Sequence, residues 1–145
     1  MNGSPAKEFI PKKGLRQSDS LAPFLFLLVA EGLAGVSRMA VEKNLINSLE
    51  IRSNKVKVNM LQYVDNTLFF CEANCKSIFN IKVALNFFEL SFGLKVNFMK
   101  SRLGGLGVKQ LTIQHFVAIL NCEVTMTPFV YLGMTVGGSH KRNAF

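Results

Sequence analysis

Cysteine and histidine are the first side chains of this 145-residue chain that could bind a metal ion. Cys71 and Cys75 lie four residues apart, the third cysteine is Cys122, and the histidines are His115 and His140. A structural zinc site needs about four ligands, usually grouped in close pairs. Both histidines lie far along the chain from the Cys71–Cys75 pair. The three cysteines are therefore predicted to be buried or incidental thiols.

Two aspartates, Asp19 and Asp65, are the next candidates for chemistry. Asp65 lies in a short polar break at residues 65–66, between β-rich runs over residues 60–63 and 67–71. Strand, tight turn and strand is the natural interpretation, and it places Asp65 at a hairpin tip. Turn chemistry alone can explain such an aspartate.

Helices and strands that alternate along the chain must position these residues. The first helical pattern starts at Ser20, where Asp19 or Ser20 can cap it, and ends near residue 44. Its spacing predicts one buried stripe made of Leu21, Leu25, Leu28, Gly32, Val36 and Met39. A second helix begins near residue 74, and Gly93 can end it. Its predicted apolar face consists of Ile78, Ile81, Leu85, Phe88 and Phe92.

The rest of the pattern is shorter. We expect a strand over residues 94–98, a glycine-rich loop over 103–108, a helix over 109–120 and a strand over 129–136. A hairpin turn is also expected at Asn2-Gly3, with no room for its first strand. The class is mixed α/β, in one domain over residues 1–145 that lacks an N-terminal strand.

Four stretches, in order, resemble the characteristic blocks of LINE-type (non-LTR retrotransposon) reverse transcriptases. Residues 14–26 (GLRQSDSLAPFLF) are similar to GLRQGDPLSPFLF, and residues 61–67 (LQYVDNT) to LQYADDT. Residues 88–101 (FELSFGLKVNFMKS) are similar to FE..SGLKIN..KS, and residues 131–133 match YLG. Four blocks in one order, over most of the chain, indicate common descent.

The resemblance implies a partial polymerase palm, with helices packed on a small, mainly antiparallel sheet. It also implies an ancestor in which carboxylates held two Mg²⁺ ions that activated the primer 3′-hydroxyl. Asp65 matches a catalytic metal ligand of that site. Arg16 and Gln17 match residues that contact nucleotide or template, with a solvated turn as the alternative. The implied partners are RNA and DNA, as template and primer.

The later blocks supply further candidates. Lys100 matches a lysine that could neutralise phosphate charge, although an exposed basic face is the simpler interpretation of the lysines and arginine around it. Tyr131, Leu132 and Gly133 correspond to the strand that supports the primer end, and the end of a core strand is the equal alternative.

Departures from the family pattern predict lost catalysis. Asn66 replaces the second aspartate of its block, and an amide brings no charge to a cation. No aspartate precedes Gly14, although the family has an essential one there. Ser18 replaces a glycine whose missing Cβ would allow close backbone approach, and Ser20 replaces a proline. We therefore regard Mg²⁺ as a cofactor of the ancestor.

Composition limits the partners. The net charge of +8 favours nucleic acid or acidic membrane surfaces. The longest apolar run, residues 21–30, is shorter than the roughly 20 residues of a membrane span, so we predict a core helix and no membrane partner. Residues 1–8 are polar, unlike a signal peptide, which predicts an intracellular protein of the cytoplasm or nucleus with reduced thiols.

The sequence thus predicts the remnant of a retroelement RNA-directed DNA polymerase that is inactive on its own. A domesticated module that binds nucleic acid without catalysis is one alternative, and a pseudogene product that does not fold is another. Absence of the upstream strand also predicts an unpaired sheet edge around residues 60–71, and therefore self-association.

Overall fold

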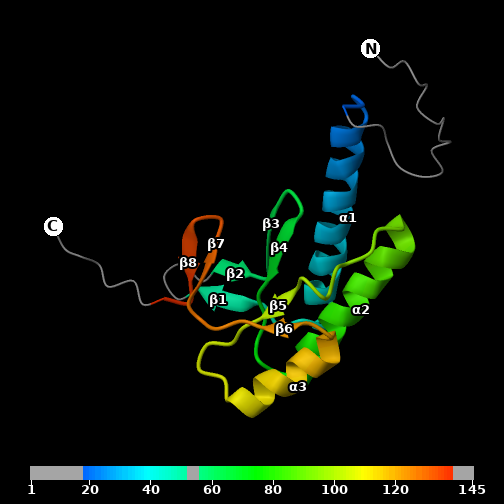
Figure 1. The fold of residues 1–145 in the computed structure, drawn as a ribbon. Coiled ribbons are helices and arrows are strands. Elements are labelled where there is room, and N and C mark those ends of the chain that lie inside the picture. Colours follow the sequence, from blue (N-terminus) through cyan, green and yellow to red (C-terminus); the bar gives the residue numbers. More distant parts are fainter. Residues whose placement is uncertain (1–17, 52–55, 139–145) are drawn as a thin grey trace, which may run out of the picture.

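The computed structural model describes residues 18–51 and 56–138, and Figure 1 shows their path. Within these ranges the helices are α1 (Ala22–Glu42), α2 (Cys75–Phe92) and α3 (Gln110–Leu120). The strands are β1 (Leu49–Ile51), β2 (Val56–Val58), β3 (Met60–Tyr63), β4 (Asn66–Phe69), β5 (Arg102–Leu103), β6 (Glu123–Val124), β7 (Phe129–Tyr131) and β8 (Met134–Val136). The hairpin expected at Asn2-Gly3 lies outside the described residues, as do Arg16 and Gln17.

In the described part of the chain, the strands form four separate two-stranded sheets. β1–β2, β3–β4 and β7–β8 are antiparallel pairs, and β5–β6 is a parallel pair. The sequence pattern missed β1, which is only three residues long. The prediction of a mixed α/β class, with helices beside small and mainly antiparallel sheets, is confirmed.

α2 is the central helix, and it packs against both α1 and α3. The side chain of Asn74 accepts a hydrogen bond from the Ser77 N–H at 2.7 Å, which caps the first turn. Gly93 ends the helix in the left-handed conformation, at φ +70°. The predicted face is confirmed except for Phe92, which is 39% exposed. The main core cluster consists of Leu33, Ala40, Ile46, Ile81, Leu85 and Phe88.

The predicted buried stripe of α1 is wrong. Leu33, Ser37 and Ala40 are the buried residues of α1, whereas four stripe residues, Leu21, Leu25, Leu28 and Met39, are exposed. The buried positions are partly small or polar because α1 approaches α2 closely, and Ser37 accepts a hydrogen bond from the Asn59 side chain at 2.8 Å. The prediction followed the large apolar residues of α1 and therefore chose a face of the helix that does not enter the core.

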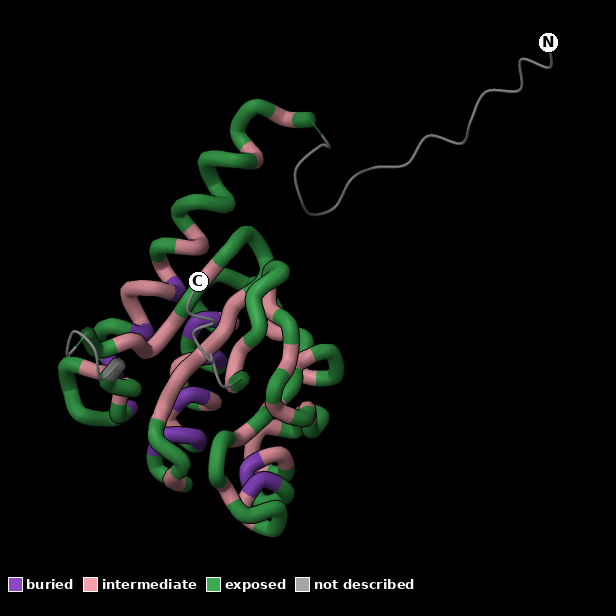
Figure 2. The backbone as a smooth tube through the Cα atoms, turned by 90° about the vertical axis from the view of Figure 1, so that its left-hand side faces the viewer, coloured by how far each residue is buried: buried purple, intermediate pink, exposed green. Residues whose placement is uncertain are grey.

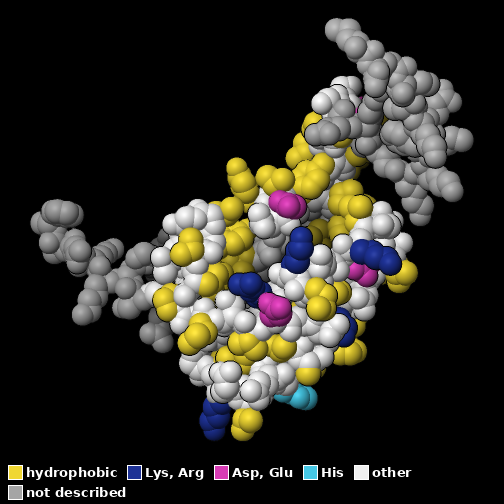
Figure 3. All heavy atoms as spheres, in the orientation of Figure 1, with side chains coloured by type: hydrophobic (Ala, Val, Ile, Leu, Met, Phe, Trp, Pro, Cys, Tyr) yellow, Lys and Arg dark blue, Asp and Glu magenta, His cyan; other side chains and the backbone are white. Residues whose placement is uncertain are grey.

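The expectation of a core helix over residues 21–30 is also wrong. This half of α1 extends past the rest of the described chain, while the buried segments lie in the body below it (Figure 2). Apolar side chains gather on its surface (Figure 3). The exposed large ones are Leu21, Phe24, Leu25, Phe26, Leu27 and Leu28. By length and composition alone α1 could cross a membrane, a test that soluble core helices and signal sequences also pass.

The start of α1 differs from the expected cap. Leu21 holds the N-cap position and has no capping side chain. The Asp19 carboxylate instead accepts a hydrogen bond from the Leu21 N–H at 2.9 Å, and its carbonyl oxygen accepts one from Ala22. Asp19 thus forms the turn that leads into the helix, and Pro23 lies in the first turn, where its missing N–H would have no helical partner.

Two predicted strands are wrong in detail. Residues 94–98 form no strand, because the Val96 N–H donates to the Glu89 side chain and the Asn97 side chain accepts from the Lys100 N–H, and such bonds compete with strand pairing. Residues 129–136 are not one strand but the hairpin β7–β8, with Leu132 and Gly133 as its two-residue turn. Both turn residues have positive φ, +50° and +80°, as tight antiparallel hairpins require.

Candidate functional site

The β3–β4 hairpin presents Asp65 at its tip, as predicted. Tyr63 pairs with Asn66, so Val64 and Asp65 are the two turn residues, and Asn66 begins β4 instead of lying in a break. The Asp65 side chain is exposed. Val64 has φ +51°, a conformation that is costly for a β-branched residue. Strained backbone of this kind often accompanies functional turns.

A second hairpin reaches this one. The Tyr131 hydroxyl donates a hydrogen bond to the carbonyl oxygen of Asn66 at 3.1 Å, across 65 residues of sequence. Tyr131 lies in β7, and Leu132 and Gly133 turn the chain into β8. The contact therefore joins the start of β4 to the end of β7. Both blocks are recognisable in the sequence, but their spacing along the chain does not predict that they touch.

Several residues of the block over residues 88–101 have structural roles in the fold. Phe88 is in the core, Glu89 accepts a hydrogen bond from the Val96 N–H, and Gly93 ends α2. Asn97 holds the following turn. Its side chain accepts from the Lys100 N–H at 3.1 Å, and its carbonyl oxygen accepts from the Ser101 hydroxyl at 2.9 Å. Sequence analysis missed Asn97, although asparagine is a frequent turn residue.

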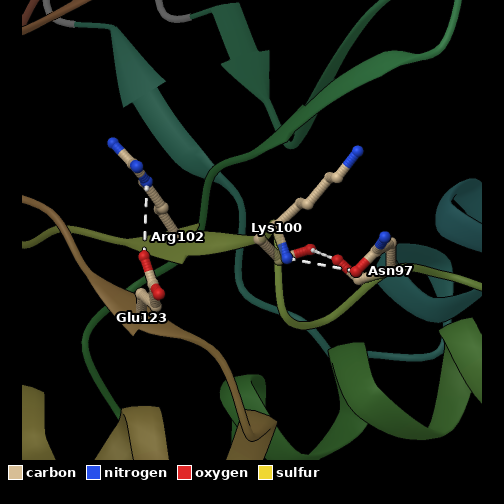
Figure 4. Close-up of polar contacts among 5 residues, drawn as sticks. Asn97, Lys100, Arg102 and Glu123 are labelled. Carbon is tan, nitrogen blue, oxygen red and sulfur yellow. Dashed lines mark hydrogen bonds and ion pairs between the residues drawn. The ribbon is translucent and has the colours of Figure 1, made fainter.

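Lys100 is displayed by that turn (Figure 4). Its side chain is exposed, and among the described residues no hydrogen bond or ion pair holds its ammonium group. Arg102 lies two residues later and pairs with Glu123 at 3.8 Å across β5 and β6, with both side chains largely exposed. Exposed pairs are weak. Lys100 is thus available for an anionic partner, whereas Arg102 is partly neutralised.

The first block is described only from Ser18 onward. Ser18 has φ +72°, in the left-handed region that glycine adopts without cost. The resembled family has glycine at this position. The conformation therefore gives a physical reason for that glycine, and it indicates that serine is strained there.

The donor set at the Asp65 tip does not fit two Mg²⁺ ions. Such a centre needs several oxygen ligands at one point, mostly anionic. Asp65 supplies one exposed carboxylate and Asn66 only a neutral amide. Within residues 18–51 and 56–138, no three His, Cys, Asp or Glu side chains gather as a metal-binding group. This hairpin alone therefore does not assemble a two-metal centre.

The cysteines differ in environment. Burial, together with the neighbouring Glu72 charge, raises the pKa of Cys71 to about 11, so Cys71 stays a neutral thiol at physiological pH. Burial also raises the pKa of Cys122. Cys75 is exposed and shares a surface hollow of about 370 Å³ with His115, despite their separation in sequence. All three are free thiols.

Comparison with known proteins gives one partial match. No family model matches the chain, and no solved structure matches it. The sequence is 37% identical over 67 residues to an uncharacterized mitochondrial protein of Arabidopsis thaliana. The match covers 46% of this chain and 55% of that protein, so it spans about half of each. The chain is thus similar, over part of its length, to a plant mitochondrial protein.

Proposed function

We propose that this chain derives from the palm of a LINE-type reverse transcriptase and that it contacts nucleic acid without polymerase activity of its own. The observation that carries the proposal is the hydrogen bond from Tyr131 to Asn66. It joins two blocks that resemble the catalytic hairpin and the primer support of that family. Such neighbours are expected if the blocks descend from one active site.

Two further observations support the same origin. The left-handed backbone at Ser18 explains why the family's corresponding residue is glycine. The turn held by Asn97 displays Lys100, whose ammonium group, like that of Lys95 in the same block, has no partner among the described residues. A lysine displayed in this way fits a role in binding phosphate groups.

The loss of catalysis is proposed because too few carboxylates lie at the hairpin tip. Asp65 is the single aspartate near the hairpin tip, because Asp19, the other aspartate of the chain, serves the turn before α1. Asn66 supplies no charge. Among the described residues, the hairpin tip therefore lacks the anionic oxygens that would neutralise two divalent cations and position a primer hydroxyl.

Primer extension tests this part of the proposal. The purified chain, given an RNA template, a DNA primer and Mg²⁺ or Mn²⁺, is expected to add no nucleotide. Asn66→Asp is expected to leave the result unchanged, because two carboxylates at the hairpin tip still supply fewer anionic oxygens than a two-metal centre needs. Template-dependent incorporation that disappears in Asp65→Ala would contradict the proposal.

A domesticated module that binds nucleic acid in another role is the second candidate, and the net charge of +8 favours it. The two candidates differ in the ligand they prefer. A palm remnant is expected to bind a primed template more tightly than an unpaired strand of equal length. A module that follows backbone charge alone is expected to bind both alike.

A further inference from the structure

α2 carries a second apolar face that no described part of the chain covers. Phe79, Val83, Phe87 and Leu90 follow one another at four, four and three residues, so they form one stripe along the helix. Their exposed fractions are 57%, 48%, 58% and 87%. The stripe lies opposite the face that enters the core. We call it the outer stripe.

The outer stripe has no free charge beside it on α2. This helix contains three charged residues, and each binds a backbone group of its own chain. Lys76 donates to the Asn44 carbonyl oxygen at 3.0 Å, Lys82 donates to that of Ile119, and Glu89 accepts from the Val96 N–H. A solvent-facing helix face normally carries charged side chains. This pattern instead resembles a face that is covered.

The stripe is complementary to itself. A surface hollow of about 420 Å³ lies at its C-terminal end, lined by Asn86, Glu89, Leu90, Gly93 and Lys95. Phe79 projects at the other end, eleven residues or roughly 16 Å away. If two copies pack antiparallel about a two-fold axis, Phe79 of each copy meets Leu90 of the other. Each phenylalanine ring then fills the partner's hollow.

From these observations we infer that the outer stripe is a homodimer interface in which α2 packs antiparallel against α2 of a second copy. The four side chains expose roughly 450 Å² per copy, taking roughly 200 Å² for a phenylalanine. With the flanking polar residues, the total approaches the lower end of specific interfaces, about 1,200 Å². The dimer is therefore weak and concentration-dependent. This inference does not rest on the proposed function.

Sedimentation velocity of the full chain over a range of micromolar concentrations tests the dimer. A monomer–dimer equilibrium is expected, and Phe87→Glu with Leu90→Glu should raise its Kd by roughly 30-fold or more. Leu111→Glu is the matched control, since Leu111 is 80% exposed on α3 outside the stripe. A monomer–dimer Kd that the double substitution leaves unchanged, or a wild-type chain that stays monomeric throughout, overturns the inference.

Disulfide cross-linking tests the antiparallel register independently of affinity. In a Cys75→Ser background, chains with Phe79→Cys are mixed with chains with Leu90→Cys under mild oxidation. A mixed disulfide is expected, and neither variant should cross-link with itself, because like positions lie roughly 16 Å apart. Self-cross-linking of either variant, or no mixed disulfide, contradicts the interface.

Discussion

Gly32 is the residue of α1 that lies against the Phe92 ring of α2. A Cβ atom at this position would collide with the Phe92 ring, which itself stacks near Phe88 with ring centroids 5.0 Å apart. A Cβ atom at Gly35, one turn further along the same helix, would have no other atom within 4 Å. Substituting alanine at Gly32 therefore tests packing against Phe92, whereas the same substitution at Gly35 tests helix propensity alone.

Gly32→Ala is expected to leave the free energy of unfolding roughly 1–3 kcal/mol below that of Gly35→Ala, because the Phe92 ring must move out of its place and this offsets the gain in helix propensity. Gly35→Ala is expected to raise it by roughly 0.5–1 kcal/mol through the better helix propensity of alanine. Urea unfolding of both variants measures the difference. Equal shifts in the same direction would contradict the close α1–α2 contact at Gly32.

For single residues, the sequence predicts the position correctly where local turn and cap preferences determine it. Asp65 at a hairpin tip and Gly93 at a helix end both follow from turn and cap preferences. It failed for Ser37, a buried polar residue that no apolar count can select. The contact of Tyr131 with Asn66 is tertiary, and spacing along one chain does not encode it.

Among the elements, the two hairpins β3–β4 and β7–β8 determine the candidate site. They belong to separate sheets and meet at the hydrogen bond from Tyr131 to Asn66. The sequence predicted the first hairpin from its polar tip. It did not predict the second, because the run over residues 129–136 contains a single glycine and is otherwise rich in the aromatic and β-branched residues of a strand.

Tyr131→Phe is expected to uncouple the two hairpins. Amide hydrogen exchange around Asp65 and Asn66 should accelerate several-fold, with a loss of global stability of at most about 1 kcal/mol, since the bond is exposed. Tyr63→Phe is the matched control. Tyr63 is 61% exposed, and its hydroxyl has no hydrogen-bond partner among the described residues. Equal acceleration in both variants would contradict the coupling.

α2 and α1 show why helix faces differ in predictability. α2 has a cap at Asn74, a stop at Gly93 and a core face of four buried apolar residues. The first half of α1 is apolar on every side, so periodicity cannot indicate which side packs. Its second half buries Ser37 and Ala40 in preference to larger neighbours.

At the scale of the whole molecule, exposed apolar surface and unpaired strand edges predict association. β3 and β4 pair only with each other in the described sheets, and this hairpin carries a single charged residue, Asp65. β1 and β2 instead contain Glu50 and Lys57, and charges on a strand discourage edge pairing. The β3–β4 edge is therefore the stronger aggregation site.

We expect the chain to form open-ended assemblies at high concentration, beyond any α2 dimer, despite its charge of +8. Leu61→Lys should reduce light scattering by placing a charge on this edge. Leu49→Lys on β1 should not, although both leucines are 43% exposed. A wild-type chain that forms nothing larger than a dimer and unfolds cooperatively would refute the prediction that the β3–β4 edge drives aggregation.

The central claim is that the chain keeps a surface for nucleic acid after losing catalysis, and the salt dependence of binding tests it most directly. Affinity for a primed RNA template is to be measured from about 50 to about 200 mM salt for wild type and two charge-matched variants. One, the site variant, is Arg16→Gln with Lys100→Gln, the two basic residues that the sequence resemblance assigns to nucleic-acid contact. The other is Lys43→Gln with Lys57→Gln, elsewhere on the chain.

Wild type should lose affinity steeply as salt rises. The site variant should bind more weakly than the control variant and show a log–log salt slope shallower by about one to two, as two lost phosphate contacts require. The control should stay close to wild type. Binding that ignores salt, or equal losses in the two variants, would contradict the claim.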